Sequence, residues 1–537
     1  MTAGDRASRW GTRAALAIAA AGTLWRLMLA QGPLDRLVAT FVADDAFYYT
    51  QIARNWLAGH GPTFDGVAAT NGFHPLWMLV SVAAQMVAGP DPEAVLRVLL
   101  AVSAICSFGT MAFVIWWTSR RIAPDAPIAA PLAAAFLAFN PFVVGTDLMG
   151  VEAPLAAFCG LLALTAHDAF TRAPRARLAV ATGAACGLAF LARTDLGLLV
   201  LLIGLDVVRR AVKPTGDDVS TRPRITGTHF LVFALVAFAM AAPWLEWSLA
   251  RFGTIWQDSG RVLMLRQHAI ETATGQGGAA YLFACAVHGA RDYGVRLMGG
   301  PDERFTIITL VHLVVAYIVL RARGVRASGS FPIIYAIFAA GIWTFYILVF
   351  RQQKYWYFSP VNLAAALLLA RWCATARAAL AERSLARGIA FASVAVVMLG
   401  SFAWISPDFY RNGFHPWQSS YLQVARDLAD GRVPGIGAGD MIGAFNAGIL
   451  GAFAPNRVIN LDGVVHPPII AAMREGRFMS YARGIGVDVL IDHQGLIETY
   501  ALWSQNDPPT KFEMLARYSG VSVGGDYVVA RIGDANP

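Results

Sequence analysis

Two adjacent acids, Asp44 and Asp45, lie after the first apolar run and are candidates for acid–base chemistry. They precede an amphipathic helical segment of about fourteen residues that ends at the glycines around His60. A carboxylate at such a position can cap the helix or act as a general base toward a hydroxyl. Two neighbouring carboxylates repel each other, so a helix cap alone does not explain the pair.

Two further acids, Asp147 and Glu152, lie in a short glycine-containing segment between apolar runs. They are candidate ligands for sugar hydroxyls or a cation. Glu152 also stands directly before an apolar run, where an acid favours the start of a helix. The sequence leaves both interpretations open.

Arg193 and Asp195 separate two short apolar runs. Ionisable residues at membrane depth are costly unless they are paired or functional. We therefore predict either an internal ion pair that stabilises the turn or a pair of substrate-binding residues.

Cations alternate with aromatic residues in the segment that begins at Arg351 and contains Lys354, Tyr355 and Tyr357. A lipid phosphate at the headgroup boundary needs cationic donors for its oxygens and aromatic walls for its chain. This segment is therefore a candidate phosphate site. The alternative is an aromatic belt with cations that extend toward water.

The elements that must position these residues are membrane helices. The chain has 537 residues, of which 56% are hydrophobic and 15% charged, and its mean hydropathy is +0.51. About eleven apolar runs are long enough to cross a bilayer with their flanks, and they lie near 12–31, 97–118, 127–146, 153–171, 178–192, 195–208, 228–249, 305–320, 331–350, 360–371 and 388–405. We predict a polytopic α-helical membrane protein.

Arginine-rich loops predict the orientation, because basic loops stay in the cytoplasm. They place the N-terminus inside and the segments 32–96, 147–152, 193–195, 250–304 and 351–359 outside. Residues 75–89 are apolar but short, so we predict an interfacial or re-entrant helix there; a true crossing is the alternative. The net charge of +8 resides largely in these loops, and no nucleic-acid motif accompanies it.

Residues 406–537 are less apolar than the rest and contain strand-like runs near 457–461, 487–491 and 527–532. They predict a small soluble α/β domain outside the membrane, following a transmembrane module over 1–405. The chain lacks a Walker loop, a dinucleotide fingerprint, an HExxH motif and a GxSxG elbow. Because the candidate acids and aromatics also cluster outside, a nucleotide-sugar donor on the cytoplasmic side is disfavoured.

The first outer loop resembles that of the GT-C-fold membrane glycosyltransferases, such as the protein mannosyltransferases, aminoarabinose transferases and arabinofuranosyltransferases. Their pattern is an acid after the first membrane helix, a juxtamembrane helix and a Pro-Leu-aromatic segment. Asp44, Tyr48–Trp56 and His74-Pro75-Leu76-Trp77 follow this order. The resemblance covers roughly residues 10–405, but only this first loop is specific.

The resemblance implies transfer of a sugar from a polyprenyl-phosphate donor, with inversion, to a glycan, lipid or protein at the outer face of a bacterial inner membrane. It makes Asp44 the general base, with Asp45 beside it. His74 would contact substrate, and the segment around Lys354 would hold the donor phosphate. The carboxylates show no fixed metal-ligand spacing, so we expect no cofactor. The alternatives are a lipid-linked sugar flippase or transporter and a non-catalytic scaffold.

Overall fold

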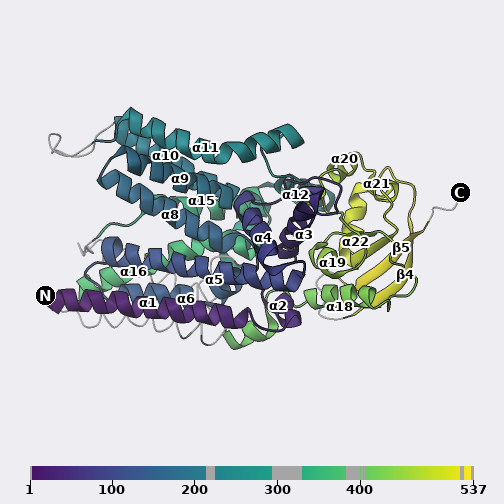
Figure 1. The fold of residues 1–537 in the computed structure, drawn as a ribbon, viewed down its shortest axis with the longest axis horizontal. Helices are drawn as coiled ribbons and strands as arrows, with labels where there is room; N and C mark the ends of the chain where they lie inside the picture. The colour runs from purple at the N-terminus through teal and green to yellow at the C-terminus, as the bar shows by residue number, and fades with distance from the viewer. Residues whose placement is uncertain are drawn as a thin grey trace.

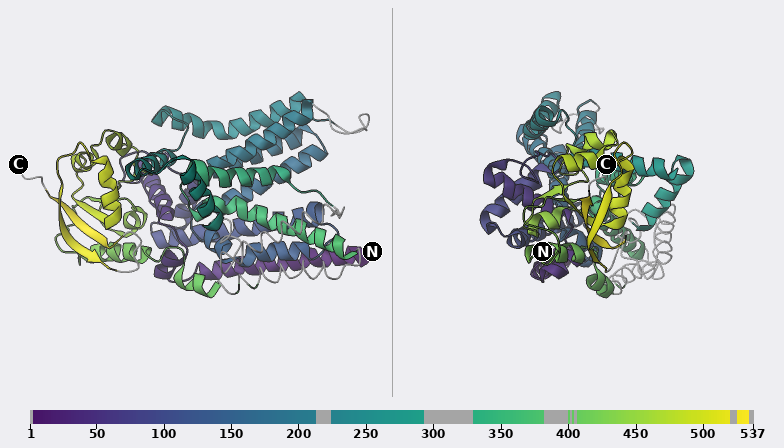
Figure 2. Two further views of the ribbon diagram at one scale, coloured as in Figure 1. Left: turned by 180° about the vertical axis from the view of Figure 1, so that it is seen from behind. Right: turned by 90° about the vertical axis from the view of Figure 1, so that its right-hand side faces the viewer.

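The structure is a computed structural model that describes residues 3–212, 224–292, 329–381, 400, 403, 406–519 and 525–533. A long bundle of helices carries a smaller α/β unit at one end (Figure 1). The start of the first described helix lies at the end of the bundle away from the α/β unit, and the view from behind shows the same arrangement (Figure 2, left).

The bundle is built from helices, and many of them overlap the predicted apolar runs. They are α1 (Ala3–Leu29), α2 (Leu34–Thr40), α3 (Asp45–Asn55), α4 (Pro75–Ala88), α5 (Pro92–Trp117), α6 (Ala129–Phe139), α7 (Pro141–Asp147), α8 (Ala153–Arg172), α9 (Ala176–Ala192), α10 (Gly197–Val212), α11 (Gly227–Phe252), α12 (Asp258–Thr274), α13 (Gly278–Ala290), α15 (Ile333–Thr344) and α16 (Ser359–Ala381).

Four of the described helices are long and apolar enough to cross a membrane: Pro92–Ile122, Ala153–Arg172, Gly227–Phe252 and Tyr355–Ala378. Two bent pairs, α1 with α2 and α6 with α7, raise this number to six if each pair is one span. Of the predicted runs, 305–320 lies outside the described residues and 388–405 almost entirely so. The chain is therefore a helical membrane protein, and the count of eleven spans stays a prediction.

The local sequence explains where the apolar runs break into separate helices. The run 127–146 divides into α6 and α7, which are bent by 60°. Pro141 begins α7, where its missing N–H costs nothing, and the Asn140 side chain accepts a hydrogen bond from the Phe142 N–H at 3.0 Å. Residues 75–88 form one short helix, α4, which packs against α3 and α5.

The C-terminal unit, residues 406–533, contains a five-stranded mixed sheet in the order β2-β1-β3-β5-β4. Its strands are β1 (Ile442–Ala444), β2 (Val458–Asn460), β3 (Val489–His493), β4 (Lys511–Tyr518) and β5 (Tyr527–Gly533). Its helices are α18 (Gln418–Ala429), α19 (Gly448–Phe453), α20 (Ile469–Arg474), α21 (Phe478–Gly484) and α22 (Gln494–Tyr500). Strands β2, β1 and β3 are parallel, and β5 is antiparallel to β3 and β4. The three predicted strands coincide with β2, β3 and β5.

The C-terminal unit packs directly on the first outer loop, with backbone against backbone. A Cβ atom on Gly448 would lie 2.1 Å from the Asp44 carbonyl oxygen, and one on Gly72 would lie 1.9 Å from that of Val464. Only glycine permits such approaches. Loop and unit therefore form one continuous surface above the bundle.

Candidate active site

Asp44 lies just before α3, but its side chain makes no capping bond to that helix. Its two carboxylate oxygens instead accept the backbone N–H groups of Gly448 at 2.9 Å and Ile449 at 2.7 Å, at the start of α19. The residue is 6% exposed. Asp44 thus binds the C-terminal unit. It does not cap α3, and its side chain is buried.

Burial raises the pKa of Asp44 to about 7, although the two N–H groups act in the opposite direction. One turn along α3, the Tyr48 hydroxyl donates to the Phe445 carbonyl at 3.2 Å and accepts from the Ala447 N–H at 3.2 Å. These contacts lie at the carboxyl ends of β1 and β2, the edge where open α/β sheets bind ligands. In this protein the first outer loop occupies that edge.

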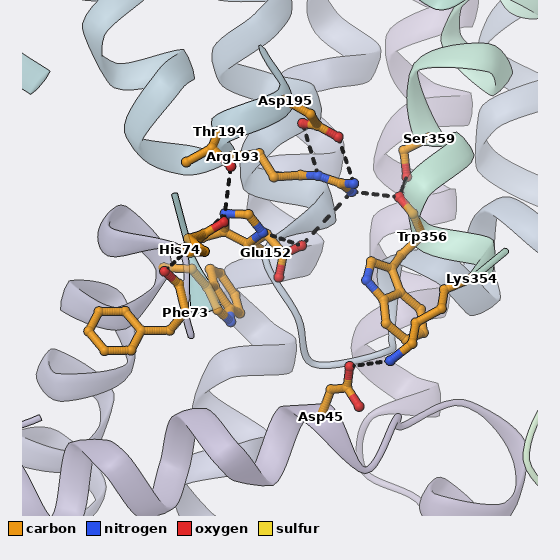
Figure 3. A network of polar contacts seen from close by, with 12 residues as sticks. Asp45, Phe73, His74, Glu152, Arg193, Thr194, Asp195, Lys354, Trp356 and Ser359 are labelled. Carbon is orange, nitrogen blue, oxygen red and sulfur yellow. Dashed lines mark hydrogen bonds and ion pairs between the residues drawn. The ribbon is translucent and has the colours of Figure 1, made fainter. Parts of the chain in front are cut away.

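Asp45 faces the other way and is the accessible acid. Its carboxylate forms an ion pair with the Lys354 ammonium at 2.8 Å, and the two side chains are 30% and 29% exposed (Figure 3). The ammonium also lies 4.9 Å from the centre of the Trp356 ring. Burial lowers the pKa of Lys354, but Asp45 and Tyr357 together raise it by more, and the pKa lies above its ordinary value.

A second group of charges surrounds Arg193, which is 3% exposed. Its guanidinium pairs with Asp195 at 2.8 Å and donates to the Trp356 carbonyl at 2.9 Å. The Tyr346 hydroxyl donates to Asp195 at 2.7 Å. The ion pair predicted for this turn is therefore present, and it connects the turn to the segment that carries Lys354 (Figure 3).

Glu152 extends this group toward the first outer loop. Its carboxylate lies 3.9 Å from Arg193 and 3.5 Å from His74 Nε2, and it accepts the Tyr49 hydroxyl at 3.1 Å. Burial, and then Arg193, lower the pKa of His74 to about 3, so this imidazole is neutral at pH 7. Glu152 and Asp195 therefore form an acidic wall, and Arg193 balances part of its negative charge.

The other predicted site residues lie elsewhere. Arg351 forms a two-pronged salt bridge with Glu271 on α12, at 2.5 and 2.9 Å. The Tyr355 ring packs 4.5 Å from Phe414, and Tyr357 stacks on Tyr346 at 4.3 Å with its ring 5.0 Å from Arg193. Asp147 pairs with Arg26 at 2.8 Å inside the bundle. The structure therefore groups His74, Glu152, Arg193, Asp195 and Tyr357 beside Asp45 and Lys354, whereas Arg351 and Asp147 have partners outside this group.

Comparisons with known proteins agree with this architecture. The sequence model of the dolichyl-phosphate-mannose-protein mannosyltransferase family matches residues 38–252. The structure of ArnT from Cupriavidus metallidurans bound to undecaprenyl phosphate is similar over 96% of this chain and 97% of that chain, with 14% identity and a TM-score of 0.53. The chain has the GT-C fold.

A second GT-C structure, the oligosaccharyltransferase AglB from Archaeoglobus fulgidus in complex with an inhibitory peptide and a dolichol-phosphate, is similar over 96% of this chain and 74% of that one. Its identity is 14% and its TM-score 0.50. No curated protein matches the chain. The resemblance seen in the first outer loop is confirmed by these matches.

Two residues near the Asp45–Lys354 pair received no role from the sequence: Arg266 lies in the predicted outer loop 250–304, and Asp462 lies in a turn. Arg266 on α12 donates to the Tyr500 hydroxyl at 3.4 Å and to Gln352 Oε1 at 3.2 Å, and within the described chain it forms no ion pair. Asp462, after β2, has a pKa raised to about 6 by burial and opposed by Arg266 and Lys354. Both lie in segments rich in polar residues, and no spacing in the sequence distinguishes them.

No group of three or more His, Cys, Asp or Glu residues in the described part of the chain has an arrangement that could hold a metal ion. Glu152 and Asp195 both lie against Arg193.

Proposed function

We propose that this protein is an inverting glycosyltransferase. It would move a hexose or pentose from a polyprenyl-phosphate donor to a glycan, lipid or protein hydroxyl at the outer face of a bacterial inner membrane. The observation that carries the proposal is the Asp45–Lys354 pair, a part-exposed carboxylate and ammonium 2.8 Å apart. The fold supports it, because similar structures contain undecaprenyl phosphate or dolichol-phosphate.

The donor phosphate would bind between Lys354 and Arg266. The sequence favours Arg351 for this role, but the Arg351 guanidinium is already bound by Glu271. Arg266 is held by two neutral partners, one of which, Gln352, is two residues from Lys354. A guanidinium that forms no salt bridge is available to bind a phosphate oxygen.

Asp45 would be the general base in place of Asp44. When the phosphate binds Lys354, the Asp45 carboxylate loses its partner and is free to accept the proton of the acceptor hydroxyl. The hydroxyl oxygen then attacks the anomeric carbon, and the bond from that carbon to the phosphate oxygen breaks with inversion. The leaving polyprenyl phosphate gains a negative charge, which Lys354 and Arg266 stabilise. Asp44 would hold Asp45 in position, because its contacts with the C-terminal unit anchor the start of α3.

The sugar would lie against the acidic wall. Glu152 and Asp195 accept hydroxyl hydrogens, and a neutral His74, with its side chain 19% exposed, can donate or accept. Tyr357 would supply an aromatic face. Asp462 lies on the side of the C-terminal unit, where an acceptor would approach.

The test is binding and transfer by the purified protein. Undecaprenyl phosphate binding, measured by native mass spectrometry, should weaken about 10-fold or more in both Lys354→Gln and Arg266→Gln, since each charged contact contributes about 1.5–3 kcal/mol. Arg351→Gln is the matched control and should bind normally. Transfer of radiolabel from polyprenyl-phosphate sugars should require Asp45. A protein that binds the lipid but transfers none of a panel of hexoses and pentoses would contradict the proposal.

A further inference from the structure

Asp462 is an acidic side chain without a chemical step in the proposed reaction. It is half-buried and lies in the turn that follows β2, at the carboxyl ends of the parallel strands. Its Oδ1 atom accepts the Val464 N–H at 2.9 Å, and Gly463, with a φ of 83°, permits the turn. The turn therefore holds the carboxylate in place.

Packing of the turn against α12 brings Asp462 to the proposed phosphate site. A Cβ atom on Gly463 would lie 3.0 Å from the Val262 side chain on α12, and Figure 1 shows α12 at the junction of the bundle and the C-terminal unit. Arg266 follows one helical turn after Val262 and donates to Gln352 at 3.2 Å. The carboxylate of Asp462 thus lies on the side of Arg266 that faces the C-terminal unit.

The charges around Asp462 are those that would bind the donor phosphate. Burial raises the pKa of Asp462 to about 6, although the positive charges of Arg266 and Lys354 act in the opposite direction. The carboxylate is therefore ionised at pH 8, and it forms no salt bridge with any residue that the structure describes. The other titratable groups that face it, Tyr48 and Tyr500, have pKa values above the ordinary one and stay neutral.

Charge distinguishes the lipid product of the proposed reaction from the donor. The donor phosphate is a diester and carries one negative charge. After transfer the polyprenyl phosphate is a monoester with about two negative charges at pH 8, because its second pKa is about 6. A nearby carboxylate repels the monoester with about twice the energy with which it repels the diester.

We propose that Asp462 promotes release of the polyprenyl phosphate product. The inference rests on the proposed function, because it takes Lys354 and Arg266 as the phosphate ligands. These cations stabilise the charge that develops on the leaving phosphate, and the same attraction retains the product. The Asp462 carboxylate offsets part of that attraction, and it does so more for the product than for the donor. It therefore determines which of the two lipids stays bound.

Binding of two lipids by the purified protein at pH 8 tests this role. The probes are undecaprenyl phosphate, a monoester, and its methyl ester, a diester, and native mass spectrometry gives both dissociation constants. Asp462→Asn should bind the monoester about 10-fold and the diester about 3-fold more tightly than wild type does, because coulombic energy scales with charge. Asparagine keeps an acceptor for the Val464 N–H, so the turn should remain.

Asp488→Asn is the matched control. Asp488 is exposed and precedes β3, so it lies at the amino ends of the parallel strands, the opposite edge of the sheet from Asp462. Loss of its charge should change both constants less than about 2-fold, because solvent and salt screen distant charges.

The ratio of the two constants decides the outcome, because it does not depend on the fraction of protein that is folded. A ratio that is the same in Asp462→Asn and wild type would overturn the role of Asp462 and leave the phosphate site intact. Wild-type protein that binds neither lipid would overturn the proposed phosphate site and this inference together.

Discussion

Separate substitutions of Asp44 and Asp45 test whether Asp45 is the general base and Asp44 the anchor of the C-terminal unit. Asp45→Asn removes a base and half of an ion pair. Because the pair is about 30% exposed, its loss should cost only roughly 0.2–1 kcal/mol of stability. Loss of a general base should lower kcat about 10²–10⁴-fold, which is roughly 3–5.5 kcal/mol of barrier.

Asp44→Asn should give the opposite pattern. Asparagine keeps one acceptor oxygen but turns its NH2 group toward one of the two N–H donors, Gly448 or Ile449. A buried charged hydrogen bond contributes about 1.5–3 kcal/mol. The raised pKa of Asp44 means that the carboxylate is already partly neutral at pH 7, so we expect a loss of about 1–3 kcal/mol in docking and at most a moderate loss of turnover.

The assay pairs single-turnover transfer at saturating donor with limited proteolysis of the C-terminal unit. Wild-type protein and Arg351→Gln serve as references, since Arg351 contacts neither acid. The reasoning would be refuted by an Asp44→Asn protein that is as protease-resistant as wild type but inactive, together with an Asp45→Asn protein that transfers normally. That result would restore Asp44 as the base, as the first-loop pattern suggests.

Three further predictions concern the pH response of Asp44, the role of Glu152 and the orientation in the membrane. The pKa of Asp44 is about 7 when the C-terminal unit is packed on the first outer loop, against an ordinary value of 3.8. Protonation of Asp44 therefore favours the packed state. The packing of the unit on the loop should strengthen by up to about 4 kcal/mol as the pH falls from 8 to 4. Protease resistance of the C-terminal unit should therefore rise over that range in wild type and respond less in Asp44→Asn; an unchanged pH response would exclude Asp44 as its source. Glu152→Gln should raise KM for the sugar donor more than it lowers kcat, and the reverse pattern would place Glu152 at the reacting atoms. On a cysteine-free background, an impermeant thiol reagent should label Gln505→Cys but not Arg177→Cys in spheroplasts, and labelling of Arg177→Cys would reverse the predicted orientation.

The sequence predicted the long apolar helices because each one satisfies its own backbone and buries its own apolar length. It did not predict α12 and α13, which lie in the segment 250–304 that was expected to be an outer loop. It identified three strands but missed β1 and β4. β1 has only three residues, and most residues of β4 are exposed, so neither shows the alternation that marks a half-buried strand. Such strands are recognised by their neighbours in the sheet, which the local sequence does not contain.

For the candidate site too, local sequence identified some residues, and contacts with distant residues decide the rest. Asp45, Lys354 and the Arg193–Asp195 turn were identifiable because their charges stand beside apolar runs. Which member of the Asp44–Asp45 pair faces open space depends on Gly448, 404 residues later. Likewise, Glu271 determines that Arg351 is occupied, and no spacing within the segment 351–357 reveals it. Pairings between distant helices decide which of several equivalent charges remains accessible.

The contact between Asp44 and Gly448 also has a consequence for biosynthesis. The carboxylate emerges from the ribosome with the first outer loop, and its two N–H partners emerge 404 and 405 residues later. At about 5–20 residues per second this delay is roughly 20–80 s. Through that interval the first loop has no C-terminal unit to pack against, and the helix that carries Asp45 lacks its anchor. A nascent chain stalled before residue 448 is therefore a membrane protein with all the proposed catalytic side chains and no assembled site, and the proposed reaction has to wait until the last strands have been made and folded.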